Sequence, residues 1–504
     1  MPHRLEPAEF DVVTIGSGFG GSVAANRLAH AGKKVLVLER GPWRDSLPVR
    51  SMGIERRSPF PYGMKAVTHL LRALHLKRVS LSLNKAGMYE FFSFPGISVL
   101  VASAVGGGST AYGGLLEAPR QAAFWNARHP DLDPACIETY YDKVIADMGG
   151  VRLDREHPLP QSVWTHFPDS PGRLCHAADP QPHMALLIPP TAAEAGATVT
   201  SAAGVQRQYC AFDGDSFLGS RGGAKASVDF IYLAPVLGKG ATVRDLCQVS
   251  LIQPARPVDG GGYLVHFDDL ASKTKGVVRA ARVILAAGTL NTQRLLFASA
   301  SQVGGLQAMP ALGRRFGGNG DLLALWNKDA AGVSSFVSPP SQGAFTVAGY
   351  EDATFGFGGF PGLDTLPLPG FARRQLARKF LMFGIGGDSG RATASAADGR
   401  LRIDYDAGRE LAYGSIRDAL RVLSEESGAN VWALKKPLTV HPWGGACLGS
   451  DAQQGVVDQR GEVYGNPGLF VTDGAALPAA PGGPPSLAIA AWAHHVADGM
   501  TRSA

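Results

Sequence analysis

The stretch that decides the fold is residues 10–41, FDVVTIGSGFGGSVAANRLAHAGKKVLVLERG. Its first seven residues are rich in β-branched side chains and predict a short buried strand. The glycine-rich turn that follows opens a segment with helical apolar spacing, and KKVLVLERG predicts a second buried strand. This order of strand, helix and strand predicts a βαβ unit, which is the building block of a parallel sheet.

The turn inside this unit carries the pattern G-x-G-x-x-G at Gly16, Gly18 and Gly21. Gly16 permits the tight turn, Gly18 lets the backbone approach a pyrophosphate, and Gly21 lets the helix pack closely on the strand. Glu39 lies at the end of the second strand, where a carboxylate accepts hydrogen bonds from ribose hydroxyls. The unit therefore predicts dinucleotide binding, although by itself it is compatible with both NAD and FAD.

Composition excludes several classes of protein. The chain of 504 residues is 45% hydrophobic and 18% charged, so it can bury a large core and is not globally disordered. Its 64 glycines fall in clusters, which suggests backbone packed close to a ligand. A net charge of +5 without a long Lys/Arg run gives no indication of nucleic-acid binding. The 13 histidines lack zinc-type spacing, so we expect no metal.

The cysteines and the apolar runs bear on the location of the protein. The five cysteines are an odd, scattered set without a CxxC pair, which is typical of free thiols in a reducing compartment. No run of about 18 apolar residues predicts a membrane span. The N-terminal MPHRLEPAEF has neither an apolar signal core nor twin arginines. We therefore expect a cytoplasmic protein without an integral membrane span.

Residues 62–79, YGMKAVTHLLRALHLKRV, predict a helix, because Val67 and three leucines recur on one helical face. The simplest interpretation is a surface helix docked on the core. The alternative is a basic amphipathic lid or a peripheral membrane contact, since the Lys and Arg residues of this segment lie mostly off the apolar face.

Further segments extend the predicted fold beyond the first unit. Residues 99–118 place a glycine-rich loop after an apolar strand, and such a loop can lie flat against a ring system. Residues 281–296 form a strand that ends in AAG and turns into a helix. Residues 316–440 alternate short β-like runs with Gly/Pro turns and predict a separate antiparallel sheet, with a helix near 412–427. The chain closes with an Ala-rich helix within 481–500.

Taken together and in order, six segments resemble the glucose–methanol–choline (GMC) oxidoreductase family, and within it the cholesterol-oxidase branch. They are GSGFGGSVAANRLA, VGGGSTAYGG, GGAKASVDFIYLAP, RVILAAGTLNTQRLL, HPWGGACLG and LFVTDGAALP with the closing helix. The resemblance runs nearly end to end. It implies FAD as the cofactor and a FAD-dependent oxidoreductase acting on CH–OH donors.

The resemblance also implies the residues of the site. It places the pyrophosphate and ribose contacts in the first unit, the flavin contacts in the glycine-rich loop, the adenine contact in a later strand, and the pyrimidine-end contacts near the C-terminus. The cofactor-binding set is Gly16, Ser17, Gly18, Phe19, Gly20, Gly21, Glu39, Arg40, Gly107, Gly108, Ser109, Tyr112, Gly113, Gly114, Val249, Gly288, Asp473, Gly474 and Pro484. His441 matches the active-site histidine of the family.

Two departures from the family pattern concern catalysis. Where the family has the second active-site residue, an Asn in G-x-N-P, this chain has Pro484, which offers neither a side-chain donor nor an N–H. Ser486 is the candidate to replace that Asn, because its hydroxyl either caps the last helix or turns toward the substrate. Tyr112 replaces the flavin-loop Asn of the cholesterol-oxidase branch. The acidic residue of the sterol enzymes has no match, and Glu351 is merely nearby in sequence.

The expected fold class is α/β: a Rossmann-type FAD-binding domain with an inserted α+β substrate domain built on an antiparallel sheet. The FAD-binding domain is expected to be discontinuous and to comprise residues 1–46, 205–315 and 441–504. The substrate-binding domain is expected to comprise 47–204 and 316–440.

The expected reaction is oxidation of a CH–OH group of a bulky apolar small molecule by hydride transfer to the flavin. His441 is the expected base, because imidazole titrates near neutral pH. Oxygen or another electron acceptor would reoxidise the cofactor. Because the Asn is missing, a flavoenzyme of the same fold that performs desaturation, oxidative decarboxylation or rearrangement in a biosynthetic pathway stays open as the alternative.

Overall fold

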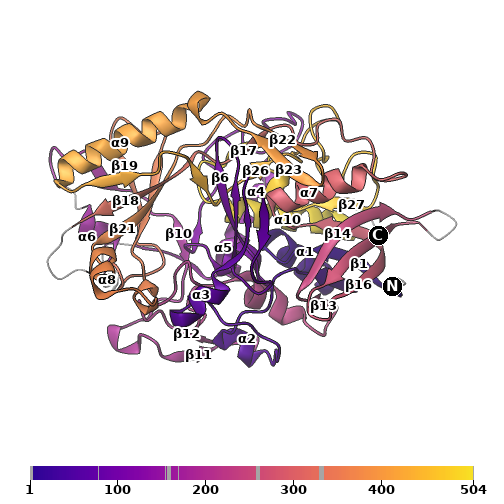
Figure 1. Cartoon of the computed structure of the whole chain (residues 1–504), viewed down its shortest axis with the longest axis horizontal. Helices are drawn as coiled ribbons and strands as arrows, with labels where there is room; N and C mark the ends of the chain where they lie inside the picture. The colour runs from indigo at the N-terminus through magenta and orange to yellow at the C-terminus, as the bar shows by residue number, and fades with distance from the viewer. Residues whose placement is uncertain are drawn as a thin grey trace.

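The computed structural model describes residues 4–77, 79–153, 155, 161–167, 170–256, 261–328 and 334–502, with side chains from residue 10 onward. Two large sheets dominate the molecule (Figure 1). One lies on the right of the view, where both chain ends are found, and the other lies on the left beneath the long helix α9.

The first sheet has seven strands and contains the βαβ unit. Its core order is β13-β2-β1-β16-β15-β14, and β27 pairs with β16. β1 pairs in parallel with both β2 and β16, and its residues Val12 to Ile15 are buried, as expected for a central strand covered on both faces. The strands are β1 (Arg4–Ile15), β2 (Val35–Leu38), β13 (Ala241–Arg244), β14 (Cys247–Pro254), β15 (Tyr263–Asp269), β16 (Thr274–Leu285) and β27 (Leu469–Val471). The predicted Rossmann-type sheet is confirmed.

Three long helices accompany this sheet. They are α1 (Phe19–His30), α7 (Thr289–Ala300) and α10 (Ser486–Arg502). Each begins directly after a glycine- or proline-rich turn, and α1 packs against α10 through small residues that allow a close approach. Since α1 follows β1 and α7 follows β16, both helices begin at the carboxyl ends of neighbouring parallel strands, where α/β folds bind ligands.

The second sheet has six strands, all joined in antiparallel pairs, in the order β24-β18-β21-β20-β19-β9. Its strands are β9 (Cys175–Ala177), β18 (Asp321–Asn327), β19 (Gly343–Val347), β20 (Thr354–Gly358), β21 (Lys379–Ile385) and β24 (Val431–Ala433). The helix α9 (Leu411–Ser427) covers one face, and a cluster of aromatic side chains fills the core between them. The antiparallel sheet and its helix near 412–427 are therefore confirmed.

The predicted helix over 62–79 is wrong for most of its length. Residues 63–69 are helical, as η1 (Gly63–Lys65) and α3 (Ala66–His69), but Leu71–His75 is the strand β3. β3 pairs in parallel with β5 (Tyr89–Ser93), so long-range strand pairing overrides the local helical periodicity. Arg78 lies outside the described residues. This third sheet has the order β25-β6-β5-β3-β4 and is completed by β4 (Ser80–Ser82), β6 (Ser98–Ala102) and β25 (Leu438–Thr439).

The remaining elements are short. The strands are β7 (Leu115–Leu116), β8 (Gly150–Arg152), β10 (His183–Ala185), β11 (Thr198–Thr200), β12 (Gln206–Gln208), β17 (Phe316–Gly317), β22 (Thr393–Ala397), β23 (Arg400–Asp404) and β26 (Trp443–Gly444). The helices are α2 (Leu47–Ser51), α4 (Ala135–Glu138), α5 (Tyr141–Asp147), α6 (Val163–His166) and α8 (Gly370–Leu376).

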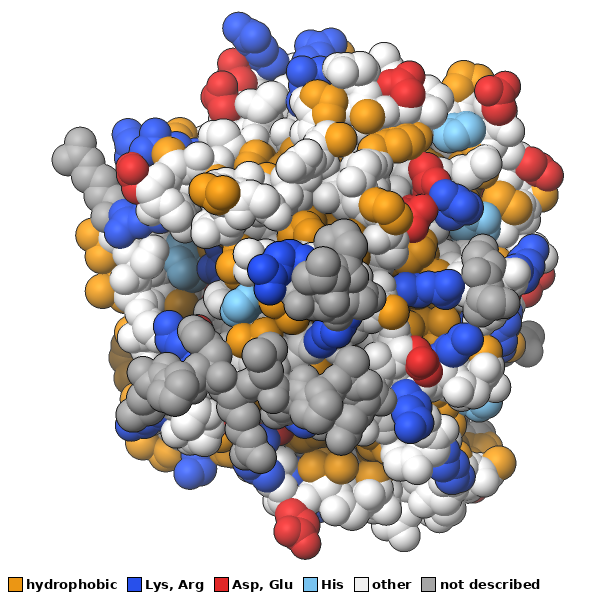
Figure 2. All heavy atoms as spheres, turned by 90° about the vertical axis from the view of Figure 1, so that its right-hand side faces the viewer, with side chains coloured by type: hydrophobic (Ala, Val, Ile, Leu, Met, Phe, Trp, Pro, Cys, Tyr) orange, Lys and Arg blue, Asp and Glu red, His pale blue; other side chains and the backbone are white. Residues whose placement is uncertain are grey.

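The surface agrees with the small net charge. Figure 2 shows the face that carries the chain ends, where Lys and Arg side chains lie singly or in small groups among acidic and hydrophobic ones. No helix in the described part of the chain is long and apolar enough to cross a bilayer. Among the same residues, no cluster of three His, Cys, Asp or Glu side chains is placed to hold a metal ion.

Candidate active site

One large cavity lies between the first sheet and the antiparallel sheet. Its volume is about 660 Å³, which is within the range of sites for sizeable ligands. Backbone of the glycine-rich turns forms one wall, and apolar side chains of the antiparallel sheet and of the third sheet form the other. Of the predicted site residues, those that line the cavity are Gly16, Gly18, Phe19, Gly20, Glu39, Arg40, Gly107, Gly108, Tyr112, Gly113, Val249, Gly288, His441, Asp473, Gly474, Pro484 and Ser486.

The first glycine-rich turn has the geometry of a phosphate cradle. Gly16 has φ +96°, and a Cβ atom there would lie 2.2 Å from the carbonyl oxygen of Ala286. A Cβ on Gly21 would lie 2.0 Å from the carbonyl oxygen of Gly16, so this glycine permits the close packing of α1 on β1. Gly18 is different, because its Cβ would have no neighbour nearer than 4.0 Å and would project toward the cavity. Bare backbone therefore faces the ligand space at Gly18.

Glu39 is held rigidly at the end of β2. Its Oε2 accepts hydrogen bonds from the backbone N–H (3.0 Å) and the hydroxyl (2.8 Å) of Ser17, and its Oε1 accepts from the N–H of Gly41 at 2.7 Å. Ser17 does not line the cavity, and its two hydrogen bonds hold the Glu39 carboxylate in place. Carboxylate oxygens have further lone pairs, so the fixed Glu39 can still accept hydrogen bonds from a ligand that enters the cavity.

The second glycine-rich loop touches the first. A Cβ on Gly107 would lie 2.7 Å from the Cα of Gly18, so only glycine permits this contact between the two loops. A Cβ on Gly108 would meet no atom within 4 Å, and this residue lines the cavity. Ser109 and Gly114 lie behind the wall, where the Ser109 hydroxyl donates to the Gly106 carbonyl at 2.7 Å. The loop thus presents bare backbone to the cavity at Gly107, Gly108 and Gly113.

Lys225 fixes the second loop from behind, a function that the sequence did not reveal. Its buried Nζ donates to the carbonyl oxygens of Tyr112 (2.8 Å), Ser216 (2.9 Å) and Thr110 (3.3 Å). Burial lowers the pKa of Lys225 to about 7. The motif GGAKASVDFIYLAP contains this lysine, but nothing in its spacing indicated that the side chain reaches the loop at residues 110–112.

Asp473 joins two segments that line the cavity. It accepts hydrogen bonds from the N–H of Gly288 (2.8 Å), the N–H of Ala475 (2.9 Å) and the hydroxyl of Thr292. Burial raises the pKa of Asp473 to about 6. The carboxylate thus ties the turn before α7 to the segment after β27, where Gly474 also lines the cavity.

His441 is paired with a buried carboxylate, and this pair is the clearest chemical feature of the cavity. The imidazole Nδ1 lies 2.9 Å from Oδ2 and 3.2 Å from Oδ1 of Asp321, whose side chain is 0% exposed. Asp321 also accepts from the Thr439 hydroxyl (2.8 Å) and the Val440 N–H (3.1 Å). Because Nδ1 donates to the carboxylate, Nε2 keeps its lone pair and makes no hydrogen bond to a described residue.

Asp321 was missed by sequence reasoning. It lies 120 residues before His441. The only signal for it was one acid at the start of an otherwise apolar strand, DLLALW. The Glu351 carboxylate, in contrast, is exposed, accepts from the N–H of Gly349 and does not line the cavity.

The turn before α10 is clamped by an asparagine from another segment. The Asn319 amide donates to the Gly483 carbonyl and accepts from the Gly482 N–H, both at 2.9 Å. Pro484 follows and lines the cavity. The Ser486 hydroxyl donates to the Leu115 carbonyl at 2.9 Å, so its proton is engaged by the backbone in this structure. The catalytic role of Ser486 stays a prediction, and it requires that this hydroxyl rotate.

Comparison with known proteins agrees with this geometry. Residues 405–493 match the GMC oxidoreductase family, and residues 14–46 match the NAD(P)-binding Rossmann-like domain. Across 97% of its length the chain is 25% identical to a cholesterol oxidase of Mycobacterium tuberculosis (strain ATCC 25618 / H37Rv), of which it covers 90%. Across 96% it is 24% identical to a cholesterol oxidase of Acinetobacter baumannii, of which it covers 93%.

One further relative and one solved structure are named for other substrates. A paromamine 6'-oxidase of Streptomyces fradiae is 26% identical over 97% of this chain and 91% of its own. A solved structure of a fungal aryl-alcohol oxidase superposes with a TM-score of 0.59 at 14% identity, over 99% of this chain and 100% of that one. This likeness to the solved structure shows the fold.

The Rossmann-like sheet, the antiparallel sheet and the shared cavity are those of an oxidoreductase that acts on CH–OH donors. Residues 405–493 match the GMC oxidoreductase family, whose members are flavoproteins, and the chain is similar over nearly its whole length to cholesterol oxidases at 24–25% identity.

Proposed function

We propose that this protein binds FAD and oxidises a CH–OH group of a bulky apolar small molecule, with His441 as the base. The observation that carries the proposal is that the His441–Asp321 pair lies at the same cavity as the two glycine-rich turns, with His441 in its lining. The cradle for a dinucleotide and a base with a free ring nitrogen therefore share one space.

The cavity fits FAD on its own geometry. Gly18, Gly108 and Gly288 border it with open space where a Cβ would lie, as a site for close backbone approach requires. The N-terminus of α1 would face the pyrophosphate, and Glu39 would accept from the ribose. The first turn of α10, at Pro485 and Ser486, lines the cavity as well, and its positive dipole end favours negative charge there. When bound, FAD would supply the acceptor for the hydride that leaves the carbinol carbon.

His441 would remove the hydroxyl proton of the substrate through Nε2. Asp321 acts in two ways in this step. Its hydrogen bond to Nδ1–H keeps the tautomer in which Nε2 is unprotonated, and its negative charge stabilises the imidazolium that forms. Because Asp321 is fully buried and bound to Thr439 and Val440 as well, it cannot turn away from His441.

The apolar character of the proposed substrate rests on the wall opposite the loops. That wall offers aliphatic and aromatic side chains, with few polar groups apart from Ser341. The lining residues from this side include Leu70, Leu71, Leu100, Val101, Phe217, Leu323, Phe357, Phe360, Leu381, Phe383, Leu438 and Val440. A bulky apolar molecule would be desolvated on entering this compartment, which favours binding.

We assign residues 1–46, 205–315 and 441–504 to a FAD-binding domain, and 47–204 and 316–440 to a substrate-binding domain whose loop at residues 107–114 also reaches the cofactor site. The strands and helices of the first sheet fall within the first three ranges, and those of the antiparallel sheet fall within the last two.

A second candidate function rests on Pro484 and Ser486. Neither offers a free donor for the substrate oxygen, since Pro484 has none and the Ser486 hydroxyl is bound to Leu115. Desaturation, oxidative decarboxylation or rearrangement would not need that donor. The alternative therefore keeps the fold and the cofactor and changes the reaction.

The test is anaerobic reduction of the bound flavin. We expect the purified protein to be yellow, to release FAD on denaturation, and to lose its oxidised flavin absorbance when mixed with one member of a panel of sterols, aryl alcohols and aminoglycosides. Mass spectrometry should then show a product that is two hydrogens lighter, one lost from the carbinol carbon and one from its hydroxyl. A protein that takes up no FAD refutes the proposal, whereas bound FAD that no alcohol reduces favours the second candidate.

A further inference from the structure

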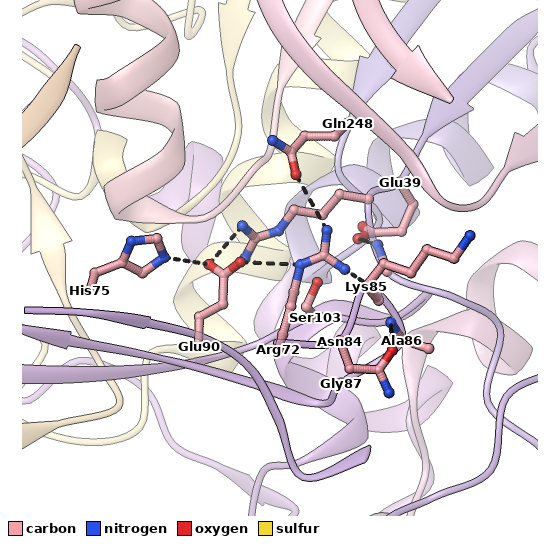
Figure 3. A network of polar contacts seen from close by, with 12 residues as sticks. Glu39, Arg72, His75, Asn84, Lys85, Ala86, Gly87, Glu90, Ser103 and Gln248 are labelled. Carbon is pink, nitrogen blue, oxygen red and sulfur yellow. Dashed lines mark hydrogen bonds and ion pairs between the residues drawn. The ribbon is translucent and has the colours of Figure 1, made fainter. Parts of the chain in front are cut away.

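A buried ionic cluster lies beside the end of the cavity where Glu39 is found. Its centre is Glu90, which is 4% exposed and comes from β5. Arg40 Nη1 donates to Glu90 Oε2 at 2.7 Å, and Arg72 Nε donates to Oε1 at 3.1 Å. Figure 3 shows Glu90 between His75 and Arg72, with Gln248 reaching the same arginine. Both carboxylate oxygens of Glu90 are thus engaged by arginines.

Arg294 is a second cavity-lining arginine near this cluster, and it makes no ion pair with Glu90. It lies on α7 and lines the cavity together with Arg40 and Gln248. Its guanidinium makes no hydrogen bond and no ion pair with a described residue. The charge of Arg40 repels it and the charge of Glu90 attracts it. Burial and the charge of Arg40 lower the pKa of Arg294. Since a guanidinium stays protonated in proteins, its donors need acceptors in the cavity.

Two amides beside Arg294 are also incompletely bonded. Gln248 accepts from Arg72 Nη2 at 3.3 Å through Oε1, and its NH₂ group donates to no described residue. Asn291 lies one helical turn before Arg294 on the same face of α7, lines the cavity, and makes no side-chain hydrogen bond within the described chain. Several donors therefore converge on this end of the cavity without a protein acceptor.

The position of these donors indicates what they bind. Arg40 directly follows Glu39, the expected ribose contact, and Gln248 directly precedes Val249, the expected adenine contact. Adenine offers ring nitrogens as acceptors and an amino group as donor, and the ribose offers oxygens. A guanidinium and a primary amide complement that set of groups.

We propose that Arg294 and Gln248 bind the adenosine half of the dinucleotide and make the protein select FAD over FMN. This inference rests on the proposed function, because it assumes that the cavity holds FAD. Glu90 acts separately as the carboxylate partner of Arg40 and Arg72, whereas Arg294 has no carboxylate bound to it within the described chain.

The experiment uses the full chain, freed of flavin by dialysis against bromide and titrated with FAD, FMN and ADP. A hydrogen bond to a charged group corresponds to a loss of affinity of about 10- to 150-fold when it is removed. We therefore expect Arg294→Met to weaken FAD and ADP by that factor and to leave FMN unchanged, because FMN lacks the adenosine half. Arg294→Lys, which keeps the charge but loses the planar fork, should lie in between.

A second readout separates this role from a merely structural one. In the flavin-free protein the unpartnered guanidinium of Arg294 is a cost, so Arg294→Met should melt at or above the temperature of the wild type while the FAD-loaded variant melts below the loaded wild type. Arg421→Met changes an exposed arginine on α9 and is the matched control, for which all affinities should equal those of the wild type.

Unchanged FAD affinity in Arg294→Met, or an equal loss for FMN and FAD, overturns the inference. These results leave the proposed function intact, because the wild type still binds FAD. A wild-type chain that binds no flavin would instead refute the proposed function.

Discussion

Replacing Asp321 by Asn tests how the structure activates His441. The two side chains have nearly the same shape, so the hydrogen bonds from Thr439 and Val440 to Oδ2 can be kept by the Asn oxygen. The Asn nitrogen then faces His441 Nδ1, where the wild type has Asp321 Oδ1 at 3.2 Å. That nitrogen is a donor, so the substitution removes the negative charge and one of the two oxygens that face Nδ1, while the oxygen kept at the Oδ2 position, 2.9 Å from Nδ1, can still accept a hydrogen bond.

The expected loss follows from these two changes. A hydrogen bond to a charged group contributes about 1.5–3 kcal/mol, so loss of the Asp321–imidazolium pair should slow flavin reduction about 10- to 150-fold. If the Asn nitrogen donates to Nδ1 in place of this bond, the imidazole proton lies on Nε2, His441 can no longer accept a proton there, and the loss grows beyond that range. Binding of FAD should be unaffected, because Asp321 does not line the cavity.

Stopped-flow reduction of the holoprotein under anaerobic conditions measures this loss, with the best alcohol of the panel as substrate. Asp418→Asn removes an exposed carboxylate on α9 and is the matched control, which should react at the wild-type rate. Circular dichroism and FAD content show whether Asp321→Asn is folded. A folded, FAD-loaded Asp321→Asn that is reduced as fast as the wild type would refute the reasoning about the pair.

Three further predictions concern the cofactor cradle and the altered turn. Gly18→Val should fold, because a Cβ at this position has no neighbour nearer than 4.0 Å. It should lose FAD, because the valine methyl groups enter the space for the pyrophosphate. Wild-type FAD content in the variant would contradict this. Lys225→Met should lower the free energy of unfolding by about 1–3 kcal/mol in urea titrations, because it leaves buried carbonyls without a donor. The pKa of Lys225 is lowered from 10.5 to about 7 in the folded protein. Between these two pH values the unfolded chain binds more protons than the folded one, so the free energy of unfolding rises with pH. Lys225→Met should flatten that rise. Pro484→Asn should improve turnover of simple alcohols if the native reaction is alcohol oxidation; loss of the native reaction without that gain, seen by product analysis, would favour the second candidate function.

Much of the fold could be predicted because its signals are local. The βαβ unit of residues 10–41 combines buried β-branched runs with a glycine turn, and β1, α1 and β2 form where that pattern indicates. The helix near 412–427 has a regular apolar face and is observed as Leu411–Ser427. The segment 62–79 has an equally regular apolar spacing. Leu71–His75 nevertheless forms a strand, because it pairs in parallel with β5.

The candidate site divides in the same way. The glycine motifs can be recognised in the sequence, because turns with positive φ and close backbone contacts require glycine. The charged partners do not, because each pair joins distant segments: Asp321 with His441, and Glu90 with Arg40 and Arg72. The role of Arg294 is harder still to predict, because it is inferred from the absence of hydrogen bonds and ion pairs to the described residues. Such pairings follow from the packing of separate sheets, which local periodicity does not determine.

The central claim is that this protein oxidises an alcohol with His441 as the base, and flavin reduction in His441→Asn tests it most directly. With the FAD-loaded variant mixed anaerobically with the best alcohol of the panel, we expect reduction to be slower than in the wild type by about 10²- to 10⁴-fold, the range for loss of a general base. FAD content should match that of the wild type. An FAD-loaded His441→Asn that is reduced at the wild-type rate would contradict the claim.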